Sequence, residues 1–200
     1  MKIGSFSWKN DWPFLLTAGL AILLQLGGPD SVALFRFDRA DVAAGQLWRV
    51  MTGNFLHLGV AHLLMNLAGL ALLGIAGRNL FSGYQWAIIL LFSLLGTGVG
   101  LYFLSPGITW YVGLSGVLHG LILALCVALI AHQPRIALGI AVVVVGKLLW
   151  EQWQGAIPLT SQLAGGTVVV DAHLYGSLAG VLAALPCIRW REKSNKSPEL

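Results

Sequence analysis

The sequence predicts an all-α membrane protein, a bundle of six transmembrane helices in a single domain that covers residues 1–200. Its composition is 57% hydrophobic and only 10% charged, whereas about a quarter of the residues are charged in a typical soluble domain. The mean hydropathy is +0.79. Helices of about 20 apolar residues cross hydrocarbon, and such windows lie near residues 12–28, 56–77, 84–104, 113–131, 135–153 and 172–190. An outer-membrane barrel would need alternating segments of about ten residues, which these uninterrupted runs exclude.

The distribution of charge predicts how the bundle is oriented. The formal net charge is +4, but the basic residues are scattered at the ends of the windows, so we expect a lipid bilayer and not nucleic acid as the partner. With the N-terminus in the cytoplasm, most basic residues fall on the inner side, and both termini are then cytoplasmic. The inner set is Lys2, Lys9, Arg78, Arg135, Arg189, Arg191, Lys193 and Lys196, and the outer set is Arg36, Arg39 and Arg49.

The first window, 12–28, lacks a convincing small-residue cleavage site before Pro29. We therefore expect it to be retained as a helix and not removed as a signal peptide. The connection that follows, residues 29–55, is the longest in the chain and mixes aromatic side chains with charges. Aromatic rings anchor at the membrane interface, so we expect this connection to fold as a small element at the outer surface.

The second window is unusually polar for a membrane helix. His62 and Asn66 are four residues apart and therefore share one face. Polar side chains inside a membrane usually face the bundle and often mark function. A hydrogen bond between helices is an alternative role for Asn66. His57 lies on another face, and it is equally well interpreted as an interfacial histidine close to Trp48 and Arg49.

Glycines on several windows predict which helices approach each other closely, because small residues let helices pack in lipid. The fourth and sixth windows run parallel, and each carries two glycines four residues apart. If these faces meet, Ser115 and His173 come within reach of each other at similar depth. The pairs are Gly116/Gly120 and Gly176/Gly180, and the third window adds Gly96, Gly98 and Gly100.

The fourth window begins with Gly113-Leu-Ser115-Gly116 at the outer end of its helix. The Ser115 amide is then one of the unpaired donors of a helix start, a place suited to stabilising an oxyanion. A serine in an apolar helix more often only packs or bonds a carbonyl, so its partners decide its role. His119, one turn further on the same face, competes with His173 for the role of base.

The fifth window carries Lys147 and Glu151 on one face, towards its outer end. One interpretation is an interfacial ion pair with side chains that extend towards water; the other is that this face lines a wet cavity. The segment 155–170 is expected to be a mobile outer loop and a candidate lid. Asp171 opens the sixth window as a cap or N-terminal charge, and it points away from His173.

Together these side chains form a candidate hydrolytic site. Serine and histidine supply a nucleophile and a general base, while His62 and Asn66 are suited to hydrogen-bonding a tetrahedral oxyanion. A zinc protease is excluded because the sequence has no H-E-x-x-H motif. An aspartyl enzyme is excluded because every aspartate lies in a loop or at a window end. We expect neither a metal nor a cofactor.

The sequence resembles the rhomboid family of intramembrane serine proteases over nearly its whole length. The motifs appear in the family's order: Trp48-Arg49, His62-x-x-x-Asn66, Gly113-Leu-Ser115-Gly116 and Ala172-His173-x-x-Gly176-x-x-x-Gly180. The resemblance implies a six-helix bundle, a dyad of Ser115 and His173 with no acid, and an oxyanion site of His62 and Asn66. The chain departs from it at His119, where well-known bacterial members carry a tyrosine packed against the catalytic histidine.

The runs around Ser115 and His173 and the stretch Lys147-Leu-Leu-Trp-Glu-Gln resemble more narrowly the rhombosortase subfamily. That resemblance implies a bacterial cytoplasmic (inner) membrane enzyme. Its membrane-anchored protein substrates would lose a C-terminal anchor that is glycine-rich at the cut. The alternatives are an inactive rhomboid-like chaperone and a small membrane transporter. An inactive relative would lack Ser115 or His173, and a transporter would show inverted repeats or broken helices, of which the sequence gives no sign.

Overall fold

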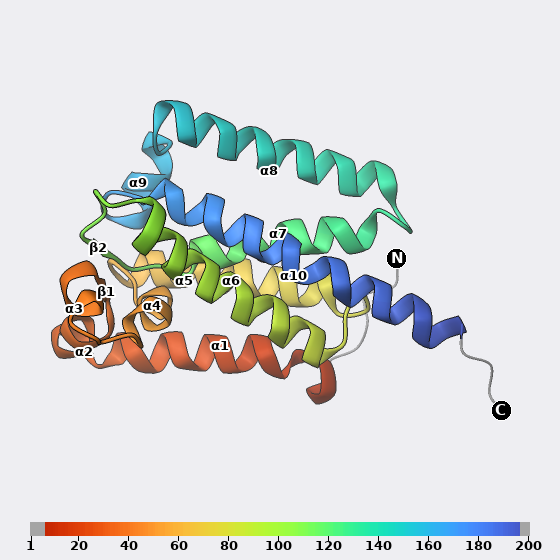
Figure 1. The fold of residues 1–200 in the computed structure, drawn as a ribbon, viewed down its shortest axis with the longest axis horizontal. Coiled ribbons are helices and arrows are strands. Elements are labelled where there is room, and N and C mark those ends of the chain that lie inside the picture. The colour runs from red at the N-terminus through yellow and green to blue at the C-terminus, as the bar shows by residue number, and fades with distance from the viewer. Residues whose placement is uncertain (1–6, 197–200) are drawn as a thin grey trace.

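A computed structural model of the chain describes residues 7–196, with side chains placed for residues 7–188. The fold is a bundle of helices with one two-stranded sheet at its end (Figure 1). The main helices are α1 (Trp8–Leu26), α5 (Val60–Gly77), α6 (Gly83–Leu104), α7 (Ser115–Leu129), α8 (Pro134–Gln154) and α10 (Val170–Lys196). The short elements are α2 (Gly28–Phe35), β1 (Phe37–Asp38), α3 (Arg39–Ala43), α4 (Arg49–Thr52), the 3-10 helix η1 (Gly53–Phe55), β2 (Trp110–Tyr111) and α9 (Pro158–Ala164).

All six apolar windows form helices, but fewer than six are long and apolar enough to cross a membrane. Within residues 7–196, four helices pass that test, namely α5, α6, α8 and the part of α10 up to Ile188, or five if α1 and α2 form one bent span. Helix α7 has 15 residues, a length of about 22 Å against a hydrocarbon core of about 30 Å. The protein is therefore a multi-pass membrane protein with four or five candidate spans among the described residues and α7 as a shorter apolar helix, and the predicted number of six spans is not confirmed.

Three predicted boundaries also change. The first helix ends at Leu26, and the chain bends by 116° into α2, where Gly28 adopts a φ of +61° that side chains rarely tolerate. The second helix begins at Val60 and not at 56. Residues 155–170, predicted as an open loop, contain the short helix α9, which starts at a proline in its first turn and ends at Gly165.

Helices α7 and α10 form the centre of the bundle, and their glycines bring the two backbones together. A methyl group on Gly116 would lie 2.6 Å from the Ala172 carbonyl oxygen. A methyl group on Gly176 would clash with the Gly116 carbonyl, and one on Gly180 would clash with the Gly120 carbonyl. The close approach predicted from the two glycine pairs is therefore present, and α6 packs against α10 through Gly96 and Gly100.

The connection from Gly28 to Phe55 folds as a small element at the end of the bundle where α7 and α10 begin (Figure 1). Its strand β1 pairs antiparallel with β2, Phe37 opposite Tyr111. Two arginines, Arg39 and the buried Arg49, hold the element together and to the bundle. Arg39 donates to four backbone carbonyls at the end of α6 and in the following loop, and Arg49 bonds the Ala33 and Arg36 carbonyls and pairs with Asp41.

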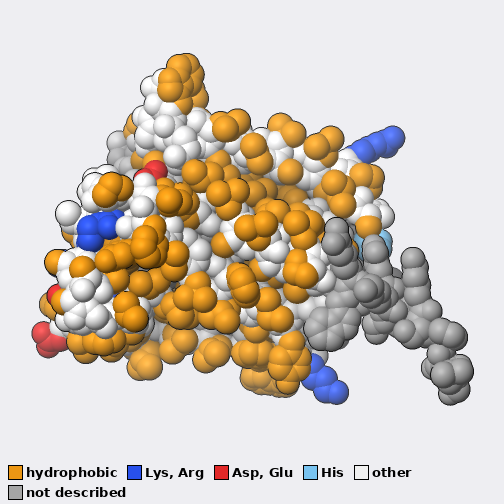
Figure 2. Space-filling view, in the orientation of Figure 1, with side chains coloured by type: hydrophobic (Ala, Val, Ile, Leu, Met, Phe, Trp, Pro, Cys, Tyr) orange, Lys and Arg blue, Asp and Glu red, His pale blue; other side chains and the backbone are white. Residues whose placement is uncertain are grey.

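Different elements lie at the two ends of the molecule. Helix α1 begins and α10 ends at one end, and the short elements gather at the other (Figure 1). Between the ends, hydrophobic side chains cover the visible face, while blue and red side chains lie at its margins (Figure 2). This is the surface expected of a bundle embedded in lipid. Lys2 lies outside the described residues, as do the side chains of Arg189, Arg191, Lys193 and Lys196, all of which the predicted orientation used.

Candidate active site

The contact between α7 and α10 places a hydroxyl beside an imidazole. Ser115 is the first residue of α7, and His173 lies in the first turn of α10. The Ser115 Oγ is 2.9 Å from His173 Nε2, a normal length for such a hydrogen bond. The His173 ring is buried with 4% of its surface exposed. The two residues that the sequence analysis paired are thus in direct contact, at the end of the bundle opposite the start of α1.

The second ring nitrogen of His173 faces a carboxylate. His173 Nδ1 lies 2.8 Å from Glu151 Oε2, and Glu151, on α8, is only 1% exposed. An ionised carboxylate can only accept hydrogen bonds, so Nδ1 carries the proton and Nε2 is left to accept from Ser115. The family resemblance implies a dyad with no acid, and the structure places a carboxylate beside this histidine, because α8 packs its Lys147/Glu151 face onto it. The predicted ion pair of Lys147 and Glu151 is present at 2.6 Å, and its carboxylate is buried against His173.

His119 lies against His173 but does not face the hydroxyl. The two imidazole rings stack, with centroids 4.2 Å apart and planes 17° from parallel. His119 Nδ1 is 2.7 Å from the Ser115 backbone oxygen, so this nitrogen is the donor. Its Nε2 lies 3.1 Å from the Lys147 ammonium. Both nitrogens of His119 are therefore engaged away from Ser115 Oγ, and the geometry favours His173 over His119 as the base.

The same cluster contains ligand types that metals use. His119, Glu151 and His173 each offer a ligand atom within 4.8 Å of the others, a grouping that sequence motifs did not reveal. The Lys147 ammonium, however, lies 2.6 Å from Glu151 Oε1 and 3.1 Å from His119 Nε2. This cation also lies 3.5 Å from His173 Nδ1 and so contacts all three ligand residues. A metal ion could therefore bind there only after displacing the lysine.

His62 and Asn66 lie on α5, beside the segment that leads into Ser115. A methyl group on Gly113 would be 3.1 Å from His62 Cε1 and 3.4 Å from its Nε2. The His62 Nδ1 accepts from the Leu58 amide at 3.4 Å, which places the ring proton on Nε2, on the Gly113 side. Asn66 is 5% exposed, and among the described residues nothing accepts a hydrogen bond from its Nδ2. A buried donor without an acceptor is costly, and a ligand oxygen would relieve that cost.

The turn before Ser115 depends on glycine. Gly113 has a φ of +136°, a backbone conformation in which a side chain is strained. The Tyr111 hydroxyl donates to the Gly113 carbonyl, and burial raises the pKa of this hydroxyl, so it stays a donor. A cavity of about 260 Å³ borders this turn and the segment before α10, with Leu58, Tyr111, Val112 and Val169 among its lining residues.

His57 is not the interfacial histidine that one interpretation described. It is 3% exposed and packs edge-on against His62, with ring centroids 4.9 Å apart. Its backbone amide donates to Gln25. Burial, and secondarily the neighbouring His62, lowers the pKa of His57 from 6.5 to about 3. His57 is therefore a neutral ring that packs against His62.

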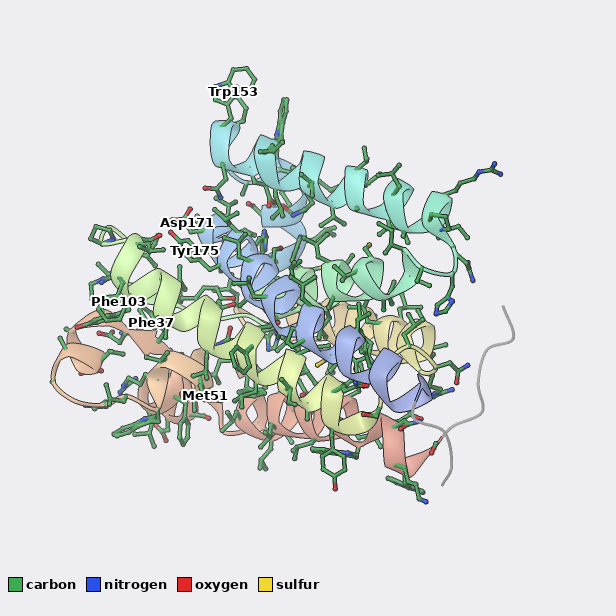
Figure 3. The ribbon with its side chains drawn as sticks, turned by 45° about the vertical axis from the view of Figure 1, so that its right-hand side comes forward. Phe37, Met51, Phe103, Trp153, Asp171 and Tyr175 are labelled. Carbon is green, nitrogen blue, oxygen red and sulfur yellow. The ribbon has the colours of Figure 1, made fainter. Side chains whose placement is uncertain are left out.

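Sequence reasoning named both members of the Lys147/Glu151 pair but did not place them in the site. The available signal was an acid and a base four residues apart inside an otherwise apolar helix, since such groups are expensive in a membrane and usually face the bundle interior. Asp171 is consistent with its expected place at the start of α10. It accepts from the Ser105 hydroxyl, which also meets the Tyr175 hydroxyl. Asp171 and Tyr175 lie close together in Figure 3.

Comparison with known proteins gives a consistent set of relatives. Residues 44–190 match the family model described as "Rhomboid domain". The chain is 32% identical to RHOMBOID-like protein 4 of Arabidopsis thaliana over 60% of its own length and 29% of the relative's. It is 24% identical to the putative rhomboid protease YdcA of Bacillus subtilis, over 76% of this chain and 73% of that one. RHOMBOID-like protein 6, mitochondrial, of Arabidopsis thaliana is 32% identical over 52% of this chain and 35% of its own. The chain thus spans about a third of the length of the two plant relatives.

Proposed function

Because the chain belongs to the rhomboid family, we infer that it is an intramembrane serine endopeptidase in which Ser115 is the nucleophile and His173 the general base. Membership of the family supports intramembrane proteolysis in general, since rhomboid proteases act on membrane protein substrates within the bilayer. The observation that supports the serine mechanism is the 2.9 Å contact between Ser115 Oγ and His173 Nε2. An inactive relative would be expected to have lost Ser115 or His173.

The geometry suggests the following sequence of proton transfers. Ser115 Oγ attacks the substrate carbonyl carbon, its proton passes to His173 Nε2, and the carbonyl electron pair moves onto the oxygen. When the tetrahedral adduct collapses, the C–N bond breaks and His173 gives the proton to the leaving amine. A water molecule then attacks the acyl ester with His173 again as the base, which regenerates the Ser115 hydroxyl and releases the carboxylate.

The developing oxyanion needs donors on the side of Ser115 that faces α5. The His62 Nε2–H, placed by the Leu58 amide on Nδ1, and the buried Asn66 amide supply two. The Ser115 amide at the start of α7 supplies a third. These donors are held in place before substrate arrives, which is what makes such stabilisation effective in a site with little water.

For the substrate, the resemblance to rhombosortases favours exported bacterial proteins with a C-terminal anchor that is glycine-rich at the cut and basic after its apolar helix. The enzyme would lie in the cytoplasmic (inner) membrane with both termini in the cytoplasm and the site near the outer face. In a regular helix the carbonyls are already hydrogen-bonded, so a segment must unwind to be cut. Glycine, about 1 kcal/mol less favourable in a helix than alanine, eases that unwinding.

A reporter release assay tests the proposal. The reporter has an external domain, a Gly-Gly junction at the outer interface, an apolar helix and a basic cytoplasmic end. Native protein should release the external domain, Ser115→Ala and His173→Ala should not, and His119→Ala should be milder. Turnover by Ser115→Ala near the native rate would refute the serine mechanism. A second reporter with Leu-Leu at the junction should resist cleavage; equal release of both, or cleavage at the cytoplasmic end, would contradict the glycine preference or the orientation.

A further inference from the structure

A closed ring of hydrogen bonds starts and ends on Ser115, and two of its members lie on α8. From the hydroxyl it runs through His173 to Glu151 Oε2, with contacts of 2.9 and 2.8 Å. The other Glu151 oxygen is 2.6 Å from Lys147 Nζ. Lys147 then meets His119, 3.1 Å away, and His119 returns to the Ser115 carbonyl at 2.7 Å.

We propose that Glu151 acts with Ser115 and His173 as a positioning residue that holds the His173 proton on Nδ1, and that Lys147 determines which side of Glu151 faces the histidine. The inference rests on the proposed serine protease function. Glu151 does not touch a reacting atom, so it acts only through His173. When His173 takes the serine proton, its cation lies 2.8 Å from the Glu151 carboxylate, and attraction at that distance stabilises the charge that forms. The carboxylate itself remains ionised throughout.

Glu151 needs a hydrogen-bond partner on each oxygen because it is buried. Glu151 is 1% exposed, and Lys147 keeps 27% of its side chain exposed. A buried carboxylate is costly unless it is paired and hydrogen-bonded, and here one oxygen bonds the histidine and the other bonds the ammonium. The His119 ring stacks on one face of the His173 imidazole and limits tilting of that ring. The hydrogen bond from Nδ1 to Glu151 fixes which way the ring nitrogens point.

The two partners of Glu151 make glutamine an informative replacement. An ammonium has donors and no acceptor, so in Glu151→Gln the amide oxygen should face Lys147. The amide NH₂ then faces His173 Nδ1 and donates to it, which forces the ring proton onto Nε2. In that tautomer His173 cannot accept the Ser115 proton. We expect kcat to fall on the order of 10³- to 10⁴-fold, as wrong-tautomer variants of serine proteases do, with KM little changed because Glu151 is shielded from substrate.

Removing the lysine should partly reverse this defect. In the double variant Glu151→Gln/Lys147→Met, no ammonium holds the amide oxygen, so the glutamine can turn and accept from Nδ1. The double variant should be at least about tenfold faster than Glu151→Gln alone, although Lys147→Met by itself is expected to slow the native enzyme. A purely structural role for Glu151 would change folding stability and leave the His173 tautomer unaltered, because removing an ammonium that has lost its partner also relieves a structural cost. Melting temperatures and the two-bond ¹H–¹⁵N spectrum of His173 are therefore recorded for both variants, and a His173 tautomer that is unchanged in Glu151→Gln would overturn the inference. Asp30→Asn, the same chemical change on an exposed carboxylate of α2, is the matched control and should match native activity.

The experiment measures kcat and KM on the cleavable reporter for native protein, Glu151→Gln, Lys147→Met, the double variant and Asp30→Asn, with Ser115→Ala in the same assay. Near-native kcat in Glu151→Gln, or a double variant no faster than that single variant, would overturn the inference. A Ser115→Ala variant with native activity would instead refute the underlying function. If Glu151→Gln does not fold, a two-bond ¹H–¹⁵N spectrum of native protein serves: His173 should be the Nδ1–H tautomer, and Nε2–H would overturn the inference. Activity that requires added Zn²⁺ and is lost with EDTA would also overturn it, by assigning the cluster to a metal.

Discussion

Replacing Gly176 by alanine tests how closely the chemistry depends on the packing of α7 against α10. The added methyl group would contact the Gly116 carbonyl oxygen and lie 2.5 Å from its carbon, whereas ordinary contact begins at 3.4 Å. The helices must therefore separate by at least about 0.9 Å, the difference between 3.4 and 2.5 Å. A shift of that size along the Ser115–His173 contact would lengthen it from 2.9 Å to about 3.8 Å, a distance at which the hydrogen bond is lost.

A misplacement of about 1 Å costs on the order of 10²-fold in rate, so Gly176→Ala should cleave the reporter about a hundredfold more slowly. Overpacking should also destabilise the fold by about 1–3 kcal/mol. Rates are therefore compared per mole of folded protein, judged by size-exclusion profile and thermal melting in detergent. Gly139→Ala, on α8 where nothing lies within 4 Å of an added methyl, is the control and should match the native rate. A native rate in Gly176→Ala would refute the idea that this glycine sets the Ser115–His173 distance.

Two further predictions concern α5 and the segment before it. His62→Ala and Asn66→Ala should each lower kcat on the order of 10²-fold with little change in KM if they bind the oxyanion; a rise in KM at unchanged kcat would contradict that role. Because the pKa of His57 is lowered to about 3 in the fold against 6.5 for the free side chain, only the unfolded state gains its proton between those values. Its contribution to stability is complete above pH 6.5 and falls as the pH drops, by about 2 kcal/mol at pH 5. Melting temperatures of native protein and His57→Phe, compared from pH 7.5 to 5, should show a steeper fall in the native protein, and equal slopes would contradict the assignment.

Much of the central packing was predictable because it depends on spacing alone. The pairs Gly116/Gly120 and Gly176/Gly180 indicated which faces of two parallel helices meet, and that contact alone brings His173 to Ser115. Two small residues four positions apart predict which face of a helix packs against its neighbour and at what level along the helix. No comparable pattern indicated how α8 packs, since its surface is largely exposed apolar residues.

The sequence could not decide between the two interpretations of Lys147 and Glu151. Its spacing from Lys147 fits an ion pair at the membrane surface as well as one in the interior, and only the position of α8 against α10 separates the two. The length of α7 was missed for a related reason. The apolar run from Gly113 is long enough to suggest a span, but Gly113 forms a turn with a φ of +136°, and the helix begins only at Ser115 and ends at Leu129.

Labelling with a serine-directed fluorophosphonate tests most directly whether Ser115 is an activated nucleophile. The reagent reacts with a serine whose proton a base can remove, and mass spectrometry of the labelled protein identifies the modified residue. Native protein should carry one label, on Ser115, while Ser115→Ala and His173→Ala should remain unlabelled under the same conditions. Labelling of Ser115→Ala to the native extent, or a label on any other serine, would contradict the assignment of Ser115 as the nucleophile.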